Sequence, residues 1–333
     1  FPFLLLGLRI IGKRVILELH QVILDINCLS GHTNLRKNGF LSAFFNFALK
    51  IFFTAISLLA NRIIVLEEEL KNRLSRFVNA SKITTLFIAI SEKESISKEE
   101  ARKTLDLNPK DFIILNFGFI NWYKGTDWII KAVKDQKVNL IVAGGQSPTL
   151  KEKTHYQNFY QKIISTSETM SNVQVTGFVK DEDIPAYFVA CDLVVLPYRA
   201  MMSSSGPLSL ALSYQKPFIL SSCLSGYFAS ADFRKSARLV DLAKEDLFFD
   251  LNYHTFKNKL KSLKITKLAK FSSNLAKMRS EKKLSRIYLK ELTYVPNSNN
   301  RRRFLSILGK LFPRKLVVRV GQSAPRVLFG SQH

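Results

Sequence analysis

The sequence predicts an α/β protein with parallel sheets that are covered by helices on both faces. Two observations lead to this prediction. In Phe112–Ser222, short continuous apolar runs alternate with segments of helical length, which is the pattern of β–α–β units. Apolar residues also make up 47% of the 333 residues, so a large core can be buried and the chain is long enough for two domains.

The strands and helices of this stretch alternate regularly. Each strand is an unbroken apolar run, as expected when both faces of a parallel sheet are buried. Ligands of such sheets bind beyond the carboxyl ends of the strands, so we expect function in the loops that follow them. The expected strands are Phe112–Phe119, Val138–Ala143, Val173–Thr176, Leu193–Pro197 and Phe218–Ser221, and the expected helices are Asp127–Lys134, Leu150–Ser165, Asp181–Ala190 and Leu208–Tyr214.

The first half of the chain contains two more expected strands. Val15–Leu19 is a short β-rich run that ends at His20, and Arg62–Leu66 leads into a helix over Glu67–Phe77. The three glutamates that open this helix suit the positive end of its dipole. These elements predict a first α/β domain that precedes the regular one.

The segment Phe40–Ala60 between these strands is almost wholly apolar and has about the length needed to cross a bilayer. Asn46 and Lys50 interrupt it, and the segment that follows has the pattern of an ordinary buried strand. We therefore expect a helix that packs on a sheet or lies at a membrane face. A transmembrane helix is the less favoured alternative.

A polar stretch, Ser91–Asn108, divides the chain; it contains an expected helix over Lys98–Leu105 and ends at Pro109. Near the other end, Arg301–Phe312 has the apolar spacing of an interfacial membrane helix, with a frayed tail as the alternative. The expected units are a partial first domain over 1–95, a second domain over 108–245, basic helices over 246–295 and a basic tail over 296–333.

The net charge of +24 and the pI of about 10 indicate an anionic partner. The excess is concentrated late in the chain: Lys257–Lys290 contains a single acidic residue, Glu281, and no Asp or Glu follows Pro296. We expect attraction to an anionic membrane surface. Nucleic-acid binding is an alternative that charge alone favours, and the sequence has no basic helix with base-reading spacing and no RNA-binding aromatic motif.

Cysteine and histidine usage argues against a metal site and against a disulfide framework. Cys28, Cys191 and Cys223 are scattered and form no CxxC pair, which fits a reducing cytosol. The five histidines form no i,i+4 pair of the kind that holds a metal. We expect a cytoplasmic protein without a bound metal.

The loop after the first strand of the regular half carries a lysine beside a glycine. Gly118–Gly125 reads Gly-Phe-Ile-Asn-Trp-Tyr-Lys-Gly. A lysine at a strand-to-helix turn can place its ammonium, together with N–H groups at the helix start, on a phosphate. The alternative is a solvated Lys124, with Gly125 present only for backbone freedom.

A second loop, Ser203–Pro207, follows another strand of the same half. Its small residues allow a close approach of the backbone to a ligand. Its hydroxyls and the N–H groups of Leu208 and Ser209 can hold a diphosphate. The alternative is that Ser204 or Ser205 only caps the helix that follows.

In order and spacing, these motifs resemble the C-terminal half of retaining family 4 glycosyltransferases of the GT-B type. The N-terminal half matches more loosely, through Ile16–Gln21 and Ala60–Leu74. The resemblance covers about residues 15–290 and implies two Rossmann-like domains facing a cleft, with the first domain incomplete. The matching segments of the second half are Gly118–Gly125, Leu140–Gly145, Val173–Phe178, Asp181–Tyr187, Ala190–Tyr198 and Ser205–Ser222.

The resemblance also implies roles for individual residues. Lys124 would bind the donor diphosphate, and His20 would be the catalytic residue, in the cleft near the transferred sugar. No metal or other cofactor is implied, because Lys or Arg side chains and helix N-termini neutralise the leaving diphosphate. The residues that would cradle the diphosphate are Ser205, Gly206, Pro207 and Leu208, and the further cleft candidates are Gly118, Asn121, Arg199 and Ser204.

The sequence departs from the family pattern in the donor loop. The two glutamates that the family often has there fall near Met202 and Leu210, and Phe119 and Asn121 stand where a second basic residue usually precedes the lysine. The family's first strands and their glycine-rich loop are also missing. Because Phe1–Leu8 has no basic leader region, we expect a truncated N-terminus rather than a signal peptide.

We therefore expect a glycosyltransferase that moves a sugar from a nucleoside diphosphate sugar to a hydroxyl of a glycan or lipid-linked acceptor, with retention. We expect it in the cytoplasm, at the periphery of an anionic membrane. The alternative that the missing carboxylates favour is a non-catalytic, glycosyltransferase-like binding protein.

Overall fold

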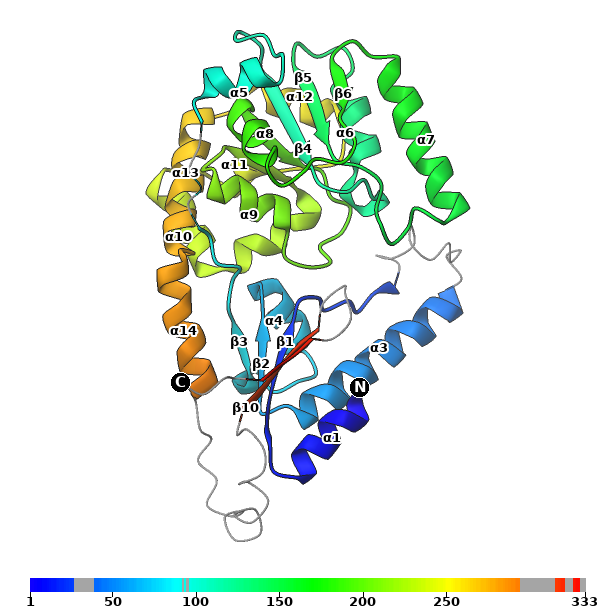
Figure 1. Cartoon of the computed structure of the whole chain (residues 1–333), viewed down its shortest axis with the longest axis vertical. Coiled ribbons are helices and arrows are strands. Elements are labelled where there is room, and N and C mark those ends of the chain that lie inside the picture. The colour runs from blue at the N-terminus through cyan, green and yellow to red at the C-terminus, as the bar shows by residue number, and fades with distance from the viewer. Residues whose placement is uncertain (27–38, 92, 94–95, 294–314, 321–325, 330–333) are drawn as a thin grey trace.

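The computed structural model describes residues 1–26, 39–91, 93, 96–293, 315–320 and 326–329. Two sheets lie at opposite ends of the molecule, and helices pack around each (Figure 1). This arrangement confirms the predicted α/β class with parallel sheets. The segment Arg301–Phe312, predicted as an interfacial helix, lies outside the described residues.

The sheet of the regular half is parallel throughout, in the order β6-β5-β4-β7-β8-β9. Because the chain leaves central β4 first toward β6 and later returns to β7, the strand order reverses between β4 and β7. A crevice for ligands lies beyond the carboxyl ends of the strands at such a point. The strands are β4 (Ile113–Phe117), β5 (Asn139–Ala143), β6 (Val173–Val175), β7 (Leu193–Leu196), β8 (Phe218–Ser221) and β9 (Phe248–Phe249).

The helices of this half follow the predicted order, with shifted ends. The helix predicted over Leu150–Ser165 begins later, at Thr154, and Lys153 is its N-cap residue. The helices are α6 (Thr126–Ala132), α7 (Thr154–Glu168), α8 (Ile184–Ala190), α9 (Gly206–Ser213), α10 (Ala231–Leu239) and α11 (Lys244–Leu247), with 3-10 helices at Trp122–Lys124 and Ser222–Ala229.

The sheet of the first half has the order β11-β10-β1-β2-β3. Residues 315–320 and 326–329 thus add strands to it, which corrects the prediction of a basic tail for those residues. Three valines in 315–320 favour a strand, and this strand pairs in parallel with the edge of β1. The basic composition of the segment gave no sign of this pairing. The strands are β1 (Arg14–Leu19), β2 (Arg62–Val65), β3 (Ile83–Thr85), β10 (Lys315–Val320) and β11 (Arg326–Phe329).

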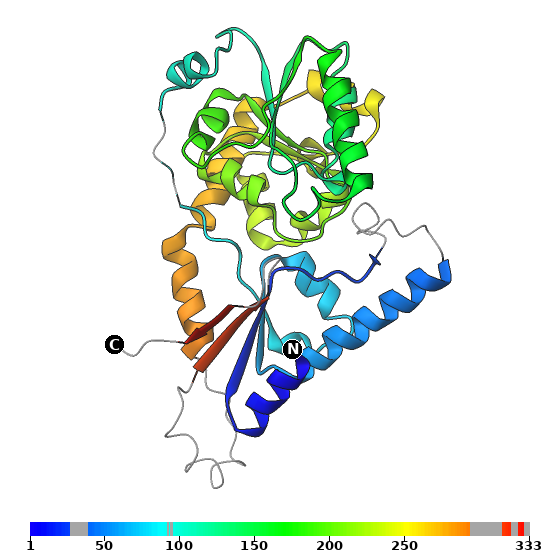
Figure 2. The ribbon, with the colours of Figure 1, turned by 45° about the vertical axis from the view of Figure 1, so that its right-hand side comes forward.

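Successive residues of β1 serve opposite faces of this sheet. Val15, Leu17 and Leu19 share a core with the N-terminal helices, whereas Ile16 packs with Leu284 on the other face. As Figures 1 and 2 show, the N-terminal helices lie side by side beneath the sheet, consistent with the contact between α1 and α3. The helices of this half are α1 (Pro2–Ile10), α3 (Gly39–Leu59) and α4 (Glu68–Leu74).

The basic segment 246–295 forms helices whose apolar faces are used by both cores. In the second half, Phe271 and Leu275 of α13 are fully buried, and α13 packs on α9, α10 and β8. In the first half, α14 packs on β1 and β2 and the Arg14 guanidinium donates to the carbonyls of Glu291 and Leu292. The helices are α12 (Tyr253–Lys261), α13 (Ile265–Met278) and α14 (Glu281–Thr293).

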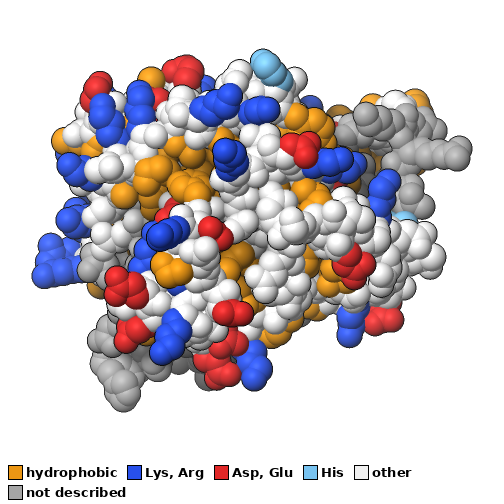
Figure 3. Space-filling model, turned by 90° about the horizontal axis from the view of Figure 1, so that it is seen from above, with side chains coloured by type: hydrophobic (Ala, Val, Ile, Leu, Met, Phe, Trp, Pro, Cys, Tyr) orange, Lys and Arg blue, Asp and Glu red, His pale blue; other side chains and the backbone are white. Residues whose placement is uncertain are grey.

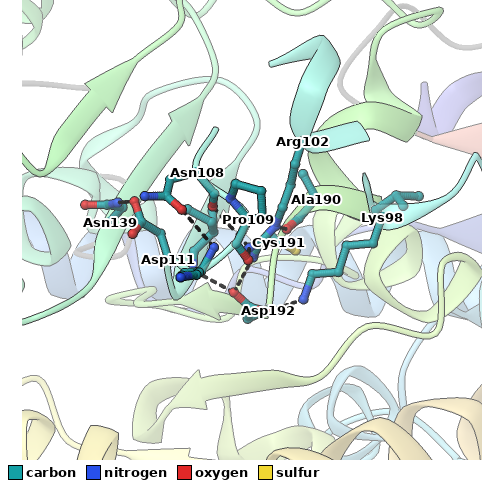
Figure 4. A network of polar contacts seen from close by, with 12 residues as sticks. Lys98, Arg102, Asn108, Pro109, Asp111, Asn139, Ala190, Cys191 and Asp192 are labelled. Atoms are coloured by element: carbon teal, nitrogen blue, oxygen red, sulfur yellow. Dashed lines mark hydrogen bonds and ion pairs between the residues drawn. The ribbon is translucent and has the colours of Figure 1, made fainter. Parts of the chain in front are cut away.

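Helix α5 (Lys98–Thr104), in the stretch that divides the chain, is anchored to the second half through Asp192 (Figure 4). The Asp192 carboxylate accepts from Lys98, from Arg102 Nη2 at 2.8 Å and from the N–H of Ile113 at 2.7 Å. Arg102 is 3% exposed, so this ion pair is shielded from solvent. The network holds the start of β4 and the end of α8 in one place.

Candidate active site

A cavity of about 290 Å³ opens between the two halves, at the carboxyl ends of β4 and β7. Both halves contribute to its wall, so the site exists only when they are together. The first half supplies His20, Gln21, Leu66 and Ile88, and the second half supplies Tyr123, Lys124, Tyr198, Met202 and the run 203–207.

Contacts between the two halves beside the cavity hold them in place. Gln21, just after β1, makes an antiparallel β-bridge with Ser203. The Arg73 guanidinium of α4 donates to the carbonyl of Met201 at 2.7 Å. Gly226 lies so close to α4 that a Cβ there would be 2.6 Å from Cγ of Glu69. The serine loop, Ser203–Pro207, is therefore held in place by contacts with the first half as well as with the second.

Lys124 extends along Gly118 into the cavity. Its Nζ would be 2.8 Å from a Cβ at Gly118, where φ is +99°, so a side chain there would displace the ammonium. Gly125 has φ of +70°, and a Cβ there would be 2.0 Å from the carbonyl oxygen of Pro197. The turn therefore requires Gly125 for its conformation, and the same turn aims Lys124 at the cavity.

The Lys124 ammonium has no hydrogen-bond or ion-pair partner among the described residues. Burial lowers its pKa to about 8, because the surrounding protein disfavours the charged form. An unpaired cation at the end of a strand, beside a helix N-terminus, is an arrangement that an anion would stabilise.

Ser205 caps α9, as the simpler alternative predicted. Its Oγ accepts from the N–H of Leu208 at 3.3 Å, and the Ser205 carbonyl accepts from Ser209 N at 3.0 Å. These N–H groups, predicted to hold a diphosphate, are therefore already used. Pro207 has no N–H, so Gly206 supplies the one N–H of this first turn that has no partner among the described residues. The helix dipole still points its positive end at the cavity.

Ser205 is also held from below by two buried tyrosines. The hydroxyl of Tyr198 lies 3.1 Å from Ser205 Oγ, and the Ser205 N–H donates to Tyr227 Oη at 3.0 Å. Burial raises the pKa of Tyr123, which packs edge-on against Tyr198, to about 12. The phenols of Tyr123, Tyr198 and Tyr227 are therefore neutral at physiological pH and add no negative charge near Lys124.

His20 lines the cavity from the first half, together with Gln21, Leu66 and Ile88. Its Nε2 is 3.0 Å from Oε1 of Glu18, which is buried on the face of the sheet that α14 covers. The other oxygen of Glu18 accepts from the hydroxyl of Tyr288 at 2.7 Å. Glu18 therefore sets the orientation of the imidazole, and α14 sets the orientation of Glu18. Sequence reasoning missed Glu18, although its place two residues before His20 puts it on the same face of the strand.

The Ser204 hydroxyl lies next to the Glu67 carboxyl, although it makes no hydrogen bond of standard geometry among the described residues. Burial raises the pKa of Glu67 to about 7, and Arg279 and, more weakly, Ser204 oppose this shift. Arg279 is itself buried and pairs with Glu67 at 3.1 Å and with Asp232 at 2.8 Å. This triad joins the first half to α10 behind the serine loop.

Arg199 and Asn121 do not line this cavity. The Arg199 guanidinium makes two bonds of 2.8 Å to the Asp127 carboxylate, lies over the ring of Trp122 and borders a second cavity of about 370 Å³. Asn121 is buried at the start of the 3-10 turn. The Asn121 side-chain oxygen has no hydrogen-bond partner among the described residues, whereas Arg199 is engaged by Asp127.

The two positions at which the sequence lacks carboxylates lie in different surroundings. Met202 is 6% exposed and lines the first cavity, whereas Leu210 packs against the core of the second half. Among the described residues, no three His, Cys, Asp or Glu side chains come together as a metal site would require.

With the two halves and the cavity between them, the molecule has the GT-B fold, and comparisons with known proteins agree with this. The sequence model of the family described as "Glycosyl transferases group 1" matches residues 97–227, which is less than half of the chain. That range includes Lys124, Arg199 and the serine loop, but not His20. No curated protein matches the sequence significantly.

Solved structures resemble the chain at low identity. Anabaena HepE, crystallised with UDP and glucose, has a TM-score of 0.64 at 15% identity, over 89% of this chain and 76% of HepE. Sucrose-phosphate synthase from Thermosynechococcus elongatus has a TM-score of 0.60 at 13% identity, over 83% and 67%. A UDP-forming trehalose-phosphate synthase from Burkholderia xenovorans has a TM-score of 0.59 at 12% identity, over 87% and 70%.

Proposed function

We propose that this protein is a glycosyltransferase that moves a sugar from a nucleoside diphosphate sugar to an acceptor hydroxyl, with retention at the anomeric carbon. The observation that carries the proposal is the Lys124 ammonium, which has no partner among the described residues, lies beside the N-terminus of α9 and shares the cavity with His20. The family match over 97–227 and the fold shared with structures that contain UDP support it.

In this proposal Lys124, the Gly206 N–H and the dipole of α9 stabilise the charge that develops on the leaving diphosphate. Positioned cations and N–H donors of this kind act most strongly where charge develops in the transition state. No metal is needed for that step, because the cation is already supplied by the side chain.

His20, held by Glu18, would lie beside the transferred sugar and position it. The described residues of the cavity wall include no carboxylate that is free to attack the sugar, so we propose that the leaving phosphate accepts the proton of the acceptor hydroxyl. The acceptor is a glycan or a lipid-linked glycan, and the enzyme works in the cytoplasm, at the periphery of an anionic membrane.

Isothermal titration with UDP and GDP tests the donor site. We expect one of them to bind wild type, and Lys124→Ala to weaken that binding roughly 10- to 100-fold, the size of a lost charge-assisted interaction. Lys134→Ala, an exposed lysine of the same half, is the matched control and should bind as wild type does. Equal binding by Lys124→Ala and wild type would refute the proposed donor site.

A non-catalytic nucleotide-sugar-binding protein is a second candidate, favoured by Met202 and Leu210 where the family often has glutamates. It shares the diphosphate site and differs only in turnover. Tight UDP or GDP binding that depends on Lys124, with no hydrolysis or transfer from any of a panel of UDP-, GDP- and ADP-sugars, would support this candidate over the enzyme.

A further inference from the structure

The first half carries an apolar surface that the described residues leave uncovered. We name it the α1–α3 surface; it consists of α1 and of residues 39–52 of α3. No residue of α3 before Phe53 is buried, and Phe40 and Phe47 are 85% and 62% exposed. The other large exposed side chains are Phe3, Leu4, Leu6 and Ile10 on α1, and Leu41, Phe44, Phe45, Ile51 and Phe52 on α3.

This surface is rigidly attached to the domain. Leu5 of α1 is fully buried with Phe53 and Ile56 of α3 in the core beneath the first sheet. The remaining N-terminal part of α3 projects away from the body of the molecule (Figure 2). The exposed phenylalanines therefore do not result from a loose helix, and an uncovered apolar area of this kind marks an interaction site.

The charges around the surface indicate the chemistry of its partner. The sequence has no Asp or Glu before Glu18 and none between Asp25 and Glu67, and Lys50 stands exposed among the phenylalanines. By contrast, the far end of the molecule shows lysines, arginines, aspartates and glutamates interspersed (Figure 3). Within α1 and α3 the charged side chains are basic, Arg9 and Lys50, and one acid, Asp25, lies beside Asn46. Apolar side chains with basic charges among them suit the interface of an anionic bilayer.

By length and composition α3 is the one helix of the described residues that could cross a membrane. The fold argues against crossing, because Phe53, Ile56 and Ser57 are packed inside the first half. The 14 residues from Gly39 to Phe52, before the first buried residue of α3, span about 21 Å as a helix, which is less than the roughly 30 Å of a hydrocarbon core. We therefore expect α3 to lie parallel to the membrane surface and not to cross the bilayer.

The polar residue that interrupts the surface connects it to the second cavity. The Asn46 amide oxygen accepts from the N–H of Ile26 at 2.7 Å, and its nitrogen approaches Asp25 at 3.4 Å. Asp25 and its neighbours Ile23 and Leu24 line the second cavity, which shares Met202 with the first. The helix that bears the exposed phenylalanines thus also holds the rim of that cavity.

We propose that the α1–α3 surface docks on the interface of an anionic phospholipid bilayer, with its helices lying in the plane of the membrane. The rim of the second cavity then lies next to the lipid. This last consequence rests on the proposed function: an acceptor anchored in the membrane would enter through the second cavity and meet the donor at Met202.

Sedimentation with vesicles tests the docking. We expect wild type to bind phosphatidylcholine vesicles that contain phosphatidylglycerol. The double variant Phe44→Ser/Phe47→Ser should bind them at least about tenfold more weakly, because it buries less apolar area in the bilayer. Lys50→Gln should lose about fivefold, the effect of one basic residue near an anionic surface. Leu239→Ser, at an exposed leucine of α10, is the matched control and should bind as wild type does.

A second measurement covers the possibility that the double variant folds poorly. Phe44→Trp keeps an aromatic side chain at the surface, and its added fluorescence should be quenched by vesicles of brominated lipid, whereas the wild-type tryptophans should not be quenched. The Lys124-dependent UDP titration is run on the same proteins, so failure of the donor site is distinguished from failure of membrane docking.

Three results would overturn the docking proposal. One is wild type that stays in the supernatant with anionic vesicles. Another is vesicle binding that is unchanged in Phe44→Ser/Phe47→Ser. The third is a wild-type dimer, seen by analytical ultracentrifugation without lipid, that the double substitution dissociates, because a second copy of the chain would then cover the surface.

Discussion

The two cavities that meet at Met202 both contain cations, but they differ in what those cations contact. In the first cavity Lys124 has no partner among the described residues, and its pKa is lowered to about 8 by burial. In the second, Arg199 is paired with Asp127, Arg73 is paired with Glu69, and Asp25 adds an acid to the wall, while Arg76 is exposed to solvent and has no ion-pair partner among the described residues. The difference is that Lys124 combines the absence of a partner with burial, whereas the cations of the second cavity are either paired or exposed to solvent.

The largest expected effect comes from the wall behind both cavities. Arg279→Met leaves Glu67 and Asp232 buried without their common cation, and we expect a loss of about 3–5 kcal/mol of unfolding free energy, the usual consequence of breaking a buried ion pair. Urea denaturation measures it, with exposed Lys277→Met as the control. Equal stability of the two variants would mean that the triad does not hold the halves together.

Substitution of one cation in each cavity sharpens the comparison directly. Lys124→Met should leave stability unchanged or raise it by up to about 1 kcal/mol, because an unpaired, partly buried charge is removed. Arg199→Met should cost about 1–2 kcal/mol, since its partly solvent-screened pair with Asp127 is lost. UDP affinity should respond in the opposite order, and the pairing argument fails if Arg199→Met weakens UDP binding as much as Lys124→Met does.

The pH dependence of UDP binding tests the role of the Lys124 ammonium and is expected to give a smaller effect than the substitutions. A bound diphosphate raises the pKa of Lys124, so binding above pH 8 requires uptake of a proton by a neutral amine. We expect the Kd for UDP to be insensitive to this group below about pH 8 and to rise above it, by at most about tenfold per pH unit. Titrations in buffers of different ionisation enthalpy measure the proton uptake, which should vanish in Lys124→Ala.

The smallest expected effect lies on the wall that the first half contributes to the first cavity. Glu18→Gln retains an acceptor for Tyr288 but changes the partner of the His20 imidazole. We expect kcat to fall several-fold with little change in KM or stability, because Glu18 positions His20 and does not touch the donor. If the carboxylate itself is needed, the pH profile of kcat should shift in Glu18→Gln and stay as in wild type in Glu18→Asp.

Much of the second half could be predicted from sequence, because its signals are local. The apolar runs over 113–117, 139–143 and 193–196 and the glycine at 125 each act within a few residues. The first half was harder, since its sheet takes β10 from the end of the chain and its core takes α14, and neither pairing leaves a local pattern. The sequence allowed two interpretations of Ser205, a helix cap or a diphosphate ligand, and sequence alone could not separate them.

By itself, the sequence determined that Lys124 and the serine loop meet at one edge of a parallel sheet, because strands that run the same way bring their carboxyl ends together. Only the tertiary structure decided which cations are available there. Arg199 is neutralised by Asp127 from the neighbouring turn, Arg279 by Glu67 from 212 residues away, and Glu18 is held by Tyr288 across 270 residues. Whether a charge is paired depends on contacts between distant segments, so it can be read only from the folded chain.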